Sequence, residues 1–251
     1  MNRHIVAIMF TVCLAAVMPI NGTSQAMDLP ATATYLFYIQ GQYAGKSDFE
    51  ITQADDILIF KSKSTIKFED YSQDLTCRTE IDKTTLRPRF FEYKGQHGDE
   101  SVSGTVWIEG DSISGHTEVS GDQFPSSGRF KDPTYLFQNY VAEHQIVIAQ
   151  AIDASKDPFL RFHVLLPSDF MTLPAVAALE SEIEMALDPK PVVCKKYVVS
   201  MQNSSAYLIY YDPNRKMPVY LDFPSVMTEV FLENAYGGKP VAKYEPPKEP
   251  E

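Results

Sequence analysis

The sequence predicts a mainly β protein of the α+β kind, with a curved antiparallel sheet or unclosed β-barrel packed around one long helix. Two observations indicate this class. Turn signals recur at intervals of roughly ten residues, and the segments between them either alternate polar and apolar residues or are rich in aromatic and β-branched ones. One stretch in the middle of the chain instead repeats its apolar residues at helical spacing.

The chain begins with the features of a secretory signal peptide, which we assign to residues 1–26. A short basic start is followed by an apolar run over residues 5–20, and Ser24-Gln25-Ala26 is a small-x-small cleavage site. Pro19 interrupts the run, which is also too short for a confident membrane span. Cys13 could indicate a lipoprotein instead, but it lacks the small residue expected before a lipidated cysteine. We therefore expect cleavage near Ala26 and a periplasmic or secreted protein with no transmembrane span.

Length and charge limit what the mature chain can be. Cleavage leaves 225 of the 251 residues, enough for a sizeable core, and we assign residues 27–240 to a single β-rich domain. Residues 241–251 are rich in proline and acid, which predicts a disordered tail. The net charge is −11, and removing a leader with one arginine and no acid makes it −12. Such a chain is a poor candidate for binding nucleic acid or, unaided, an anionic membrane.

Strands account for most of the predicted domain. In the first half they follow one another as a meander, separated by turns rich in Gly and Asp, and the second half returns to strands after the helical segment. The predicted strands are 34–40, 46–52, 57–68, 75–81, 89–94, 101–109, 112–119, 159–166, 192–201, 206–211, 217–221 and 226–232.

The first turn, GQYAGKS at residues 41–47, nearly spells a phosphate-binding loop. It has one residue too few between its glycines, and the alternating residues after it predict a strand, whereas a phosphate loop must open a helix. We interpret it as a hairpin turn in which Gly41 and Gly45 supply backbone freedom, and Lys46 and Ser47 begin the returning strand.

One helix is predicted over residues 132–151. Asp132 is a good N-cap, Pro133 suits the first helical position, and the apolar residues that follow recur at helical spacing. Its apolar face should pack on the sheet, although a partner-binding or membrane-surface helix is an alternative. Residues 175–187 are ambiguous, because their composition favours a helix while their alternation favours a strand with one buried face. Since their neighbours are strands, we expect a strand.

Export leaves two cysteines, Cys77 and Cys194. An even number of cysteines in an oxidising compartment predicts a disulfide between them. On the chain-entropy account, a bridge closing such a long loop is worth up to about 4–5 kcal/mol. The alternative is a pair of buried thiols on strands.

No pattern of catalytic or metal-ligating residues stands out. The chain lacks a Gly-x-Ser-x-Gly elbow and a His-Glu-x-x-His motif. The mature chain's histidines, His97, His116, His144 and His163, are scattered singly, whereas a metal site needs several ligands together. Paired acids occur only at turns or along one strand face. We therefore expect no enzyme, no metal and no cofactor.

Aromatic side chains are the best candidates for a binding site. The chain holds 14 Tyr and 15 Phe, and a curved sheet with a helix against it can leave an apolar cleft that binds a small hydrophobic ligand. The alternative is that these rings fill the core. We place the site on the first strand and the helix face, and the candidate ligand-binding residues are Tyr35, Phe37, Phe137, Tyr140 and His144.

Three stretches resemble an uncharacterised family of exported bacterial β proteins, a domain of unknown function. They are the aromatic strand and Gly-x-x-x-Gly hairpin at 35–45, the turn at 81–88 and the strand, turn and Pro-led strand at 210–221, within a similarity spanning about residues 34–232. The order strand–strand–helix–strand also resembles, in architecture only, the LolA/LolB-like lipoprotein carriers. Their unclosed barrel holds acyl chains against helices, but they have more helices than this chain.

Two functions follow as expectations. The first is a non-catalytic periplasmic binding protein or carrier for a lipid-like or other hydrophobic ligand. The alternative is an envelope accessory protein that acts through protein–protein contacts, by an exposed sheet edge or the acidic tail, with no small-molecule ligand.

Overall fold

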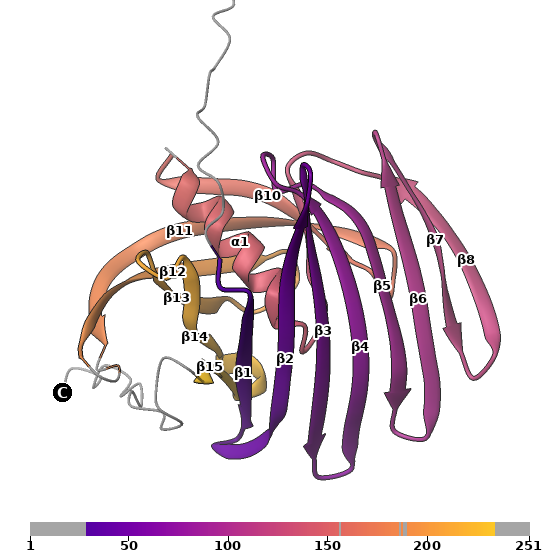
Figure 1. Cartoon of the computed structure of the whole chain (residues 1–251), viewed down its shortest axis with the longest axis horizontal. Helices are drawn as coiled ribbons and strands as arrows, with labels where there is room; N and C mark the ends of the chain where they lie inside the picture. Colours follow the sequence, from indigo (N-terminus) through magenta and orange to yellow (C-terminus); the bar gives the residue numbers. More distant parts are fainter. Residues whose placement is uncertain (1–28, 156, 186, 188–189, 234–251) are drawn as a thin grey trace, which may run out of the picture.

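The computed structural model describes residues 29–155, 157–185, 187 and 190–233, and the fold below is that of these residues. The predicted signal peptide (1–26) and tail (241–251) lie outside them. The described chain forms one 15-stranded sheet, a single α-helix and a 3-10 turn. Figure 1 shows a large, curved sheet that does not close, which confirms the predicted class.

The sheet consists of two meanders that meet at the ends of the described chain. One meander runs from β1 out to β8 and the other from β15 back to β9, so that β1 pairs with β15 in the middle of the sheet. Neighbouring strands are antiparallel, except that β9 and β10 are parallel. The strands are β1 Thr32–Ile39, β2 Gln42–Ala54, β3 Ile57–Phe68, β4 Tyr71–Asp82, β5 Pro88–His97, β6 Glu100–Glu109, β7 Ser112–Val119, β8 Asp122–Arg129, β9 Thr134–Leu136, β10 Phe159–Leu166, β11 Met171–Met185, β12 Val192–Met201, β13 Tyr207–Asp212, β14 Met217–Phe223 and β15 Thr228–Leu232.

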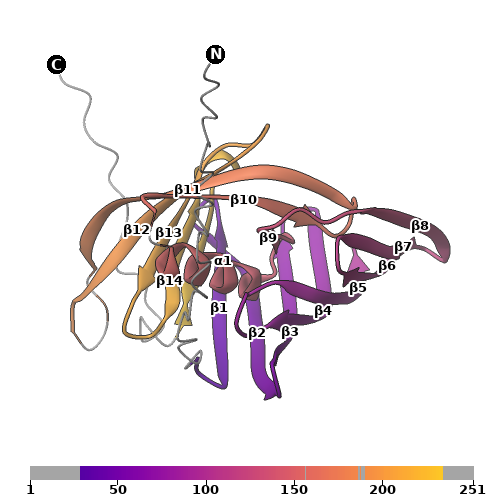
Figure 2. The ribbon, with the colours of Figure 1, turned by 90° about the horizontal axis from the view of Figure 1, so that it is seen from above.

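The sheet curves around the helix α1 (Ala142–Ala154) and then extends away from it. Seen from above (Figure 2), β12–β14, β1 and β2 lie around α1, while β6–β8 continue outward. β9 contacts β5, so that the curved part is nearly closed on its other side. Strand alternation turns one row of each strand inward, as in β3 and β4, where buried and less buried residues take turns. The main core therefore lies between α1 and the inner face of the sheet.

A second, smaller core lies under the outward extension. Its members come from β4 to β7 on one side and from the segments around β9 and β10 on the other. Phe91 and Val106 are fully buried there, against Leu165 of β10. Burial of these side chains holds β5–β7 to β9 and β10 although no hydrogen-bonded strand pair joins them.

The helix begins ten residues later than the sequence predicts. Asp132 is not its N-cap, and Pro133 is not in its first turn: they precede β9, which pairs in parallel with β10. The apolar residues at helical spacing in this stretch lie in a strand and a connection instead. α1 itself is buried from Ala142 to Ile152, and such a helix is covered on all sides rather than on one face. Among the described residues, none forms a helix long and apolar enough to cross a membrane.

The first hairpin turn is shorter than predicted. Only Gln40 and Gly41 separate β1 and β2, with φ of 53° and 75°, as a two-residue turn of the primed kind requires. Gly45 lies inside β2 with φ of 149°, and a Cβ there would stand 2.0 Å from the carbonyl oxygen of Thr65 on β3. Glycine is required at position 45 because the backbones of β2 and β3 approach closely there. The chain after Gly45 continues as a strand, so this segment is not a phosphate-binding loop, as expected.

The structure also decides one ambiguous segment and adds a strand that the sequence did not predict. Residues Met171–Met185 form β11, which confirms that the ambiguous segment is a strand. β8 was not predicted, because Pro125 and several small polar residues interrupt its pattern. β8 is an edge strand, where proline is tolerated since one side of the strand has no partner.

The predicted disulfide is wrong. Cys77 and Cys194 are both free and buried. Cys77 lies on β4 in the smaller core, and Cys194 lies on β12 in the main core, so that the curvature of the sheet keeps them apart. Burial raises the pKa of both thiols, that of Cys194 to about 12, which disfavours the reactive thiolate.

Candidate ligand-binding site

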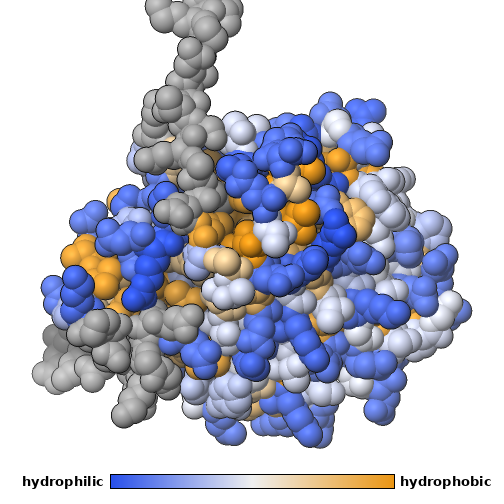
Figure 3. Space-filling model, in the orientation of Figure 1, coloured by the Kyte–Doolittle hydropathy of each residue, from blue (hydrophilic) through white to orange (hydrophobic). Residues whose placement is uncertain are grey.

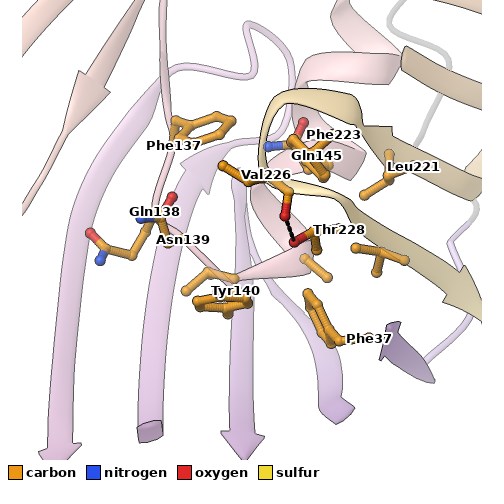
Figure 4. A pocket seen from close by; sticks show the side chains of 13 residues that line it. Phe37, Phe137, Gln138, Asn139, Tyr140, Gln145, Leu221, Phe223, Val226 and Thr228 are labelled. Atoms are coloured by element: carbon orange, nitrogen blue, oxygen red, sulfur yellow. Dashed lines mark hydrogen bonds between the residues drawn. The ribbon is translucent and has the colours of Figure 1, made fainter. Parts of the chain in front are cut away.

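An apolar pocket, called here the end pocket, opens where the central strands β1, β14 and β15 end and α1 begins (Figure 4). It has a volume of about 140 Å³. Three parts of the chain build it: the connection from β9 to α1, the start of α1, and the adjoining ends of β1, β14 and β15. Its lining residues are Phe37, Phe137, Gln138, Asn139, Tyr140, Val141, Ala142, Gln145, Leu221, Phe223, Val226, Thr228 and Val230.

Tyr140 forms one wall of the end pocket in an unusual backbone conformation. Its φ is 61°, in the left-handed region that costs a non-glycine residue about 1–2 kcal/mol. Three contacts hold it. Ser64 Oγ donates a hydrogen bond of 2.7 Å to the Tyr140 carbonyl oxygen, and the centre of the Tyr140 ring lies 5.7 Å from that of Phe37 and 5.6 Å from that of Tyr71. The surrounding sheet thus fixes the turn that leads into α1.

Two polar groups are buried at the back of the end pocket. Gln145, only 3% exposed, lines it from α1, and Tyr207 lies behind the wall, with its ring stacked 4.9 Å from that of Phe223. Gln145 lies close to the Tyr207 hydroxyl, but neither its Oε1 nor that hydroxyl makes a hydrogen bond of ordinary geometry with another described residue. A buried polar atom left without a partner is costly, so this is a place where a ligand's polar group or a water is favourable.

The rim of the end pocket is apolar and exposed. The 3-10 turn η1 (Pro224–Val226) joins β14 to β15, and Met227 follows it with φ of 48°. Val226 and Met227 are 59% and 57% exposed. Thr228 Oγ1 donates to the Val226 carbonyl oxygen at 3.2 Å, as the dashed line in Figure 4 shows. Solvent-exposed apolar groups beside an apolar pocket favour a ligand that covers both.

The end pocket is electrically neutral. None of the described residues that line it carries a formal charge. Burial raises the pKa of Tyr140 and of Tyr207, so both phenols keep their protons. The space-filling view of one face (Figure 3) shows apolar residues at the surface near α1, surrounded by hydrophilic ones.

The structure brings together three of the five residues predicted for the site. Phe37, Phe137 and Tyr140 line the end pocket. Tyr35 and His144 do not. The Tyr35 hydroxyl donates a hydrogen bond of 2.7 Å to the Pro218 carbonyl oxygen inside the main core.

His144 is a buried structural histidine. It is 1% exposed, its Nε2 lies 3.2 Å from Thr79 Oγ1, and its ring is 5.0 Å from that of Phe91. Burial lowers its pKa to about 3, so the ring is neutral. It packs α1 on the sheet and does not line the end pocket.

Sequence reasoning missed Gln145 and the residues from β14 and β15. A glutamine within an apolar helical run was a signal for Gln145, because a polar side chain among buried neighbours needs a partner. Nothing in the local pattern placed Leu221, Phe223 or Val230 beside Phe37, since that follows from the pairing of β1 with β15.

A buried acid lies on α1 next to this pocket's wall but outside it. Glu143 is fully buried, and Ser62 Oγ donates a hydrogen bond of 2.6 Å to its Oε1. Burial raises its pKa to about 7, the hydrogen bond opposing this in part. The described residues contain no group of three or more His, Cys, Asp or Glu placed to hold a metal ion.

No family model and no curated protein matches the sequence. Several solved structures match, and two of them are described here. One, a β-barrel-like protein of the domain of unknown function DUF1849 from Brucella abortus, aligns with 81% of this chain and 95% of its own at 11% identity, with a TM-score of 0.46. A DUF1089 family protein from Pseudomonas aeruginosa aligns with 72% of this chain and 90% of its own, also at 11% identity, with a TM-score of 0.43. The chain is thus similar to β proteins whose function is unknown.

Proposed function

We propose that this is an exported, non-catalytic protein that binds a hydrophobic or lipid-like ligand in the end pocket. The observation that carries the proposal is the pocket itself, which is lined mainly by aromatic and aliphatic side chains and has an unpartnered Gln145 oxygen at its back. Ligand sites are commonly of this kind, apolar with a few polar groups that fix orientation.

Export and carriage belong to the same proposal. The signal-peptide pattern of residues 1–26 supports an exported chain. A sheet that curves around one helix without closing supports carriage, because an apolar ligand can enter such a fold at its end without unfolding of the sheet. The architectural resemblance to the LolA/LolB-like carriers leads to the same expectation.

A binding assay with matched variants tests the proposal. N-phenyl-1-naphthylamine, an uncharged probe that brightens in apolar surroundings, should bind the wild-type chain. Ala142→Phe places a ring in the end pocket and should weaken binding by roughly tenfold or more, since a filled pocket excludes the probe. Ala154→Phe, an exposed position at the other end of α1, should leave binding unchanged.

A second variant covers the case in which Ala142→Phe disturbs folding. Val226→Asp adds a charge at the exposed rim of the end pocket, where little packing depends on it, and should also weaken binding of the neutral probe. Equal brightening by wild type and both pocket variants, each shown to be folded by circular dichroism, would overturn the proposal.

A further inference from the structure

A second hollow, called here the polar hollow, lies next to the end pocket. It has a volume of about 330 Å³ and is formed by the β10–β11 turn, the β12–β13 turn and the β9–α1 connection. Its apolar side comes from Leu166, Met171, Leu173 and Met201. Its polar lining residues are Gln138, Asn139, Ser168, Asp169, Gln202, Asn203 and Ser204.

The polar hollow and the end pocket share a wall. Phe137, Gln138 and Asn139 line both. The Gln138 Oε1 in this wall is buried and has no hydrogen-bond partner among the described residues. Figure 4 shows Phe137, Gln138 and Asn139 together along one side of the end pocket. The end pocket alone is smaller than the usual range for ligand sites of roughly 300–1,000 Å³, whereas the two spaces together fall within it.

The two spaces are both lined mainly by apolar surface and differ in charge. The end pocket has no charged side chain, while the polar hollow adds further amide and hydroxyl groups and the Asp169 carboxylate. The side-chain amides of Gln202 and Asn203 make no hydrogen bond to another described residue, so they remain available. Asp169 is the one charged residue in the described lining, and only Ser168 Oγ, at 3.4 Å, donates to its side chain.

We propose that the ligand is an amphiphile whose apolar tail enters the end pocket and whose head group occupies the polar hollow. The head group donates hydrogen bonds and bears no negative charge. The Asp169 carboxylate would repel an anionic head at short range, and no Lys or Arg in the described lining would compensate. This proposal depends on the function proposed above and adds the class of ligand to it.

Three ten-carbon amphiphiles test the head-group preference by displacing N-phenyl-1-naphthylamine from the full chain near neutral pH, below their micelle concentrations. Decylamine carries an ammonium group, monodecanoylglycerol a neutral diol, and decanoate a carboxylate. Because Asp169 is exposed and water screens its charge, we expect the first two to bind roughly threefold to fivefold more tightly than decanoate.

Variants at Asp169 locate the effect. Asp169→Asn should remove the higher affinity for decylamine and leave the affinity for monodecanoylglycerol unchanged. Asp169→Lys should bind decanoate at least as tightly as decylamine. Asp157→Lys makes the same change in net charge at an exposed site beyond the other end of α1, and it should keep the wild-type order. Asp169 is itself exposed in a turn, so these substitutions leave the core intact.

The outcomes separate the two proposals. If all three amphiphiles bind equally and Asp169→Lys behaves like Asp157→Lys, the head-group inference is overturned while the end pocket remains a binding site. If decanoate binds most tightly to the wild type, the inference is overturned as well. If the naphthylamine probe itself does not bind, the proposed function fails and the head-group inference fails with it.

Discussion

At Glu143 a carboxyl group is held away from water, and its burial raises the pKa to about 7 from an ordinary value of 4.5. The folded protein therefore keeps this proton at a pH where the unfolded chain has released it. Glu143 stabilises the fold fully below about pH 4.5, and that contribution is lost as the pH rises through the folded pKa. The sign is opposite to that of a paired surface acid such as Asp82, whose pKa is lowered.

Replacing this acid tests the direction. The unfolding free energy of Glu143→Gln minus that of the wild type should grow by about 3 kcal/mol as the pH rises from about 4.5 to about 8. Urea unfolding at a series of pH values measures it. Glu50→Gln, at a half-exposed side chain, is the control and should show no such trend. A Glu143→Gln difference that stays constant with pH would mean that this carboxyl is not held protonated.

Gly45 tests the close approach of β2 and β3. A Cβ at this position would lie 2.0 Å from the Thr65 carbonyl oxygen, whereas at Gly41 it would meet nothing within 4 Å. Gly45→Ala should therefore destabilise the protein by at least about 2 kcal/mol, and Gly41→Ala by about 1 kcal/mol for its positive φ alone. Urea midpoints compare the two. Equal losses would show that backbone conformation alone matters at both sites.

Residue alternation predicted which side chains turn inward, but not how far along the sheet they lie. Tyr35 and Phe37 are two residues apart and share the inner face of β1, yet only Phe37 reaches the end pocket. His144 and Gln145 are neighbours on α1, and only Gln145 lines it. Depth along a strand or helix depends on where distant elements end, which no local pattern records.

Among the elements, β8 shows how the sheet ends. The β7–β8 turn consists of the two residues Ser120 and Gly121. From this turn onward, the residue pairs between β7 and β8 alternate between hydrogen-bonded pairs and pairs without hydrogen bonds. Pro125 opposite His116 falls in a pair without hydrogen bonds, so its missing N–H would have pointed away from β7. Proline here removes a donor from the exposed edge, which opposes edge-to-edge pairing.

Pro125→Val restores that donor and should promote self-association. Light scattering coupled to size-exclusion chromatography would then show a larger, concentration-dependent mass. Ser127→Val lies two residues along the same exposed strand and adds the same side chain without adding a backbone N–H donor. Its mass in solution should equal that of the wild type. A mass increase in both variants would attribute the effect to hydrophobicity rather than to the edge.

The helix shows where element boundaries escaped prediction. Its existence was predicted correctly, but the cap and proline signals at 132–133 belong to the approach to β9. The helical spacing of Leu136, Phe137 and Tyr140 arose by coincidence: Leu136 is buried in β9, while Phe137 and Tyr140 are half-buried in the connection that lines the end pocket. The helix starts at Ala142 without a side-chain cap, so no sequence signal marked it.

For the whole molecule, the class and most strands could be predicted because each strand has its own alternation and turn. The order of strands could not, since the pairing of β1 with β15 joins the two ends of the described chain. That pairing assembles the end pocket, and it also explains why the cysteines are apart. Compartment alone predicted a disulfide, while the curved sheet places Cys77 and Cys194 in separate cores.

The central claim is that a hydrophobic ligand occupies the end pocket, and native mass spectrometry tests it most directly. The full chain, including the predicted signal peptide of residues 1–26, would be expressed in bacteria, purified and weighed before and after extraction with organic solvent. We predict a bound mass of lipid size that extraction removes from the wild type and that the Ala142→Phe variant lacks. The same ligand-free mass for both proteins, before and after extraction, would contradict the claim and favour an accessory protein that acts through protein contacts.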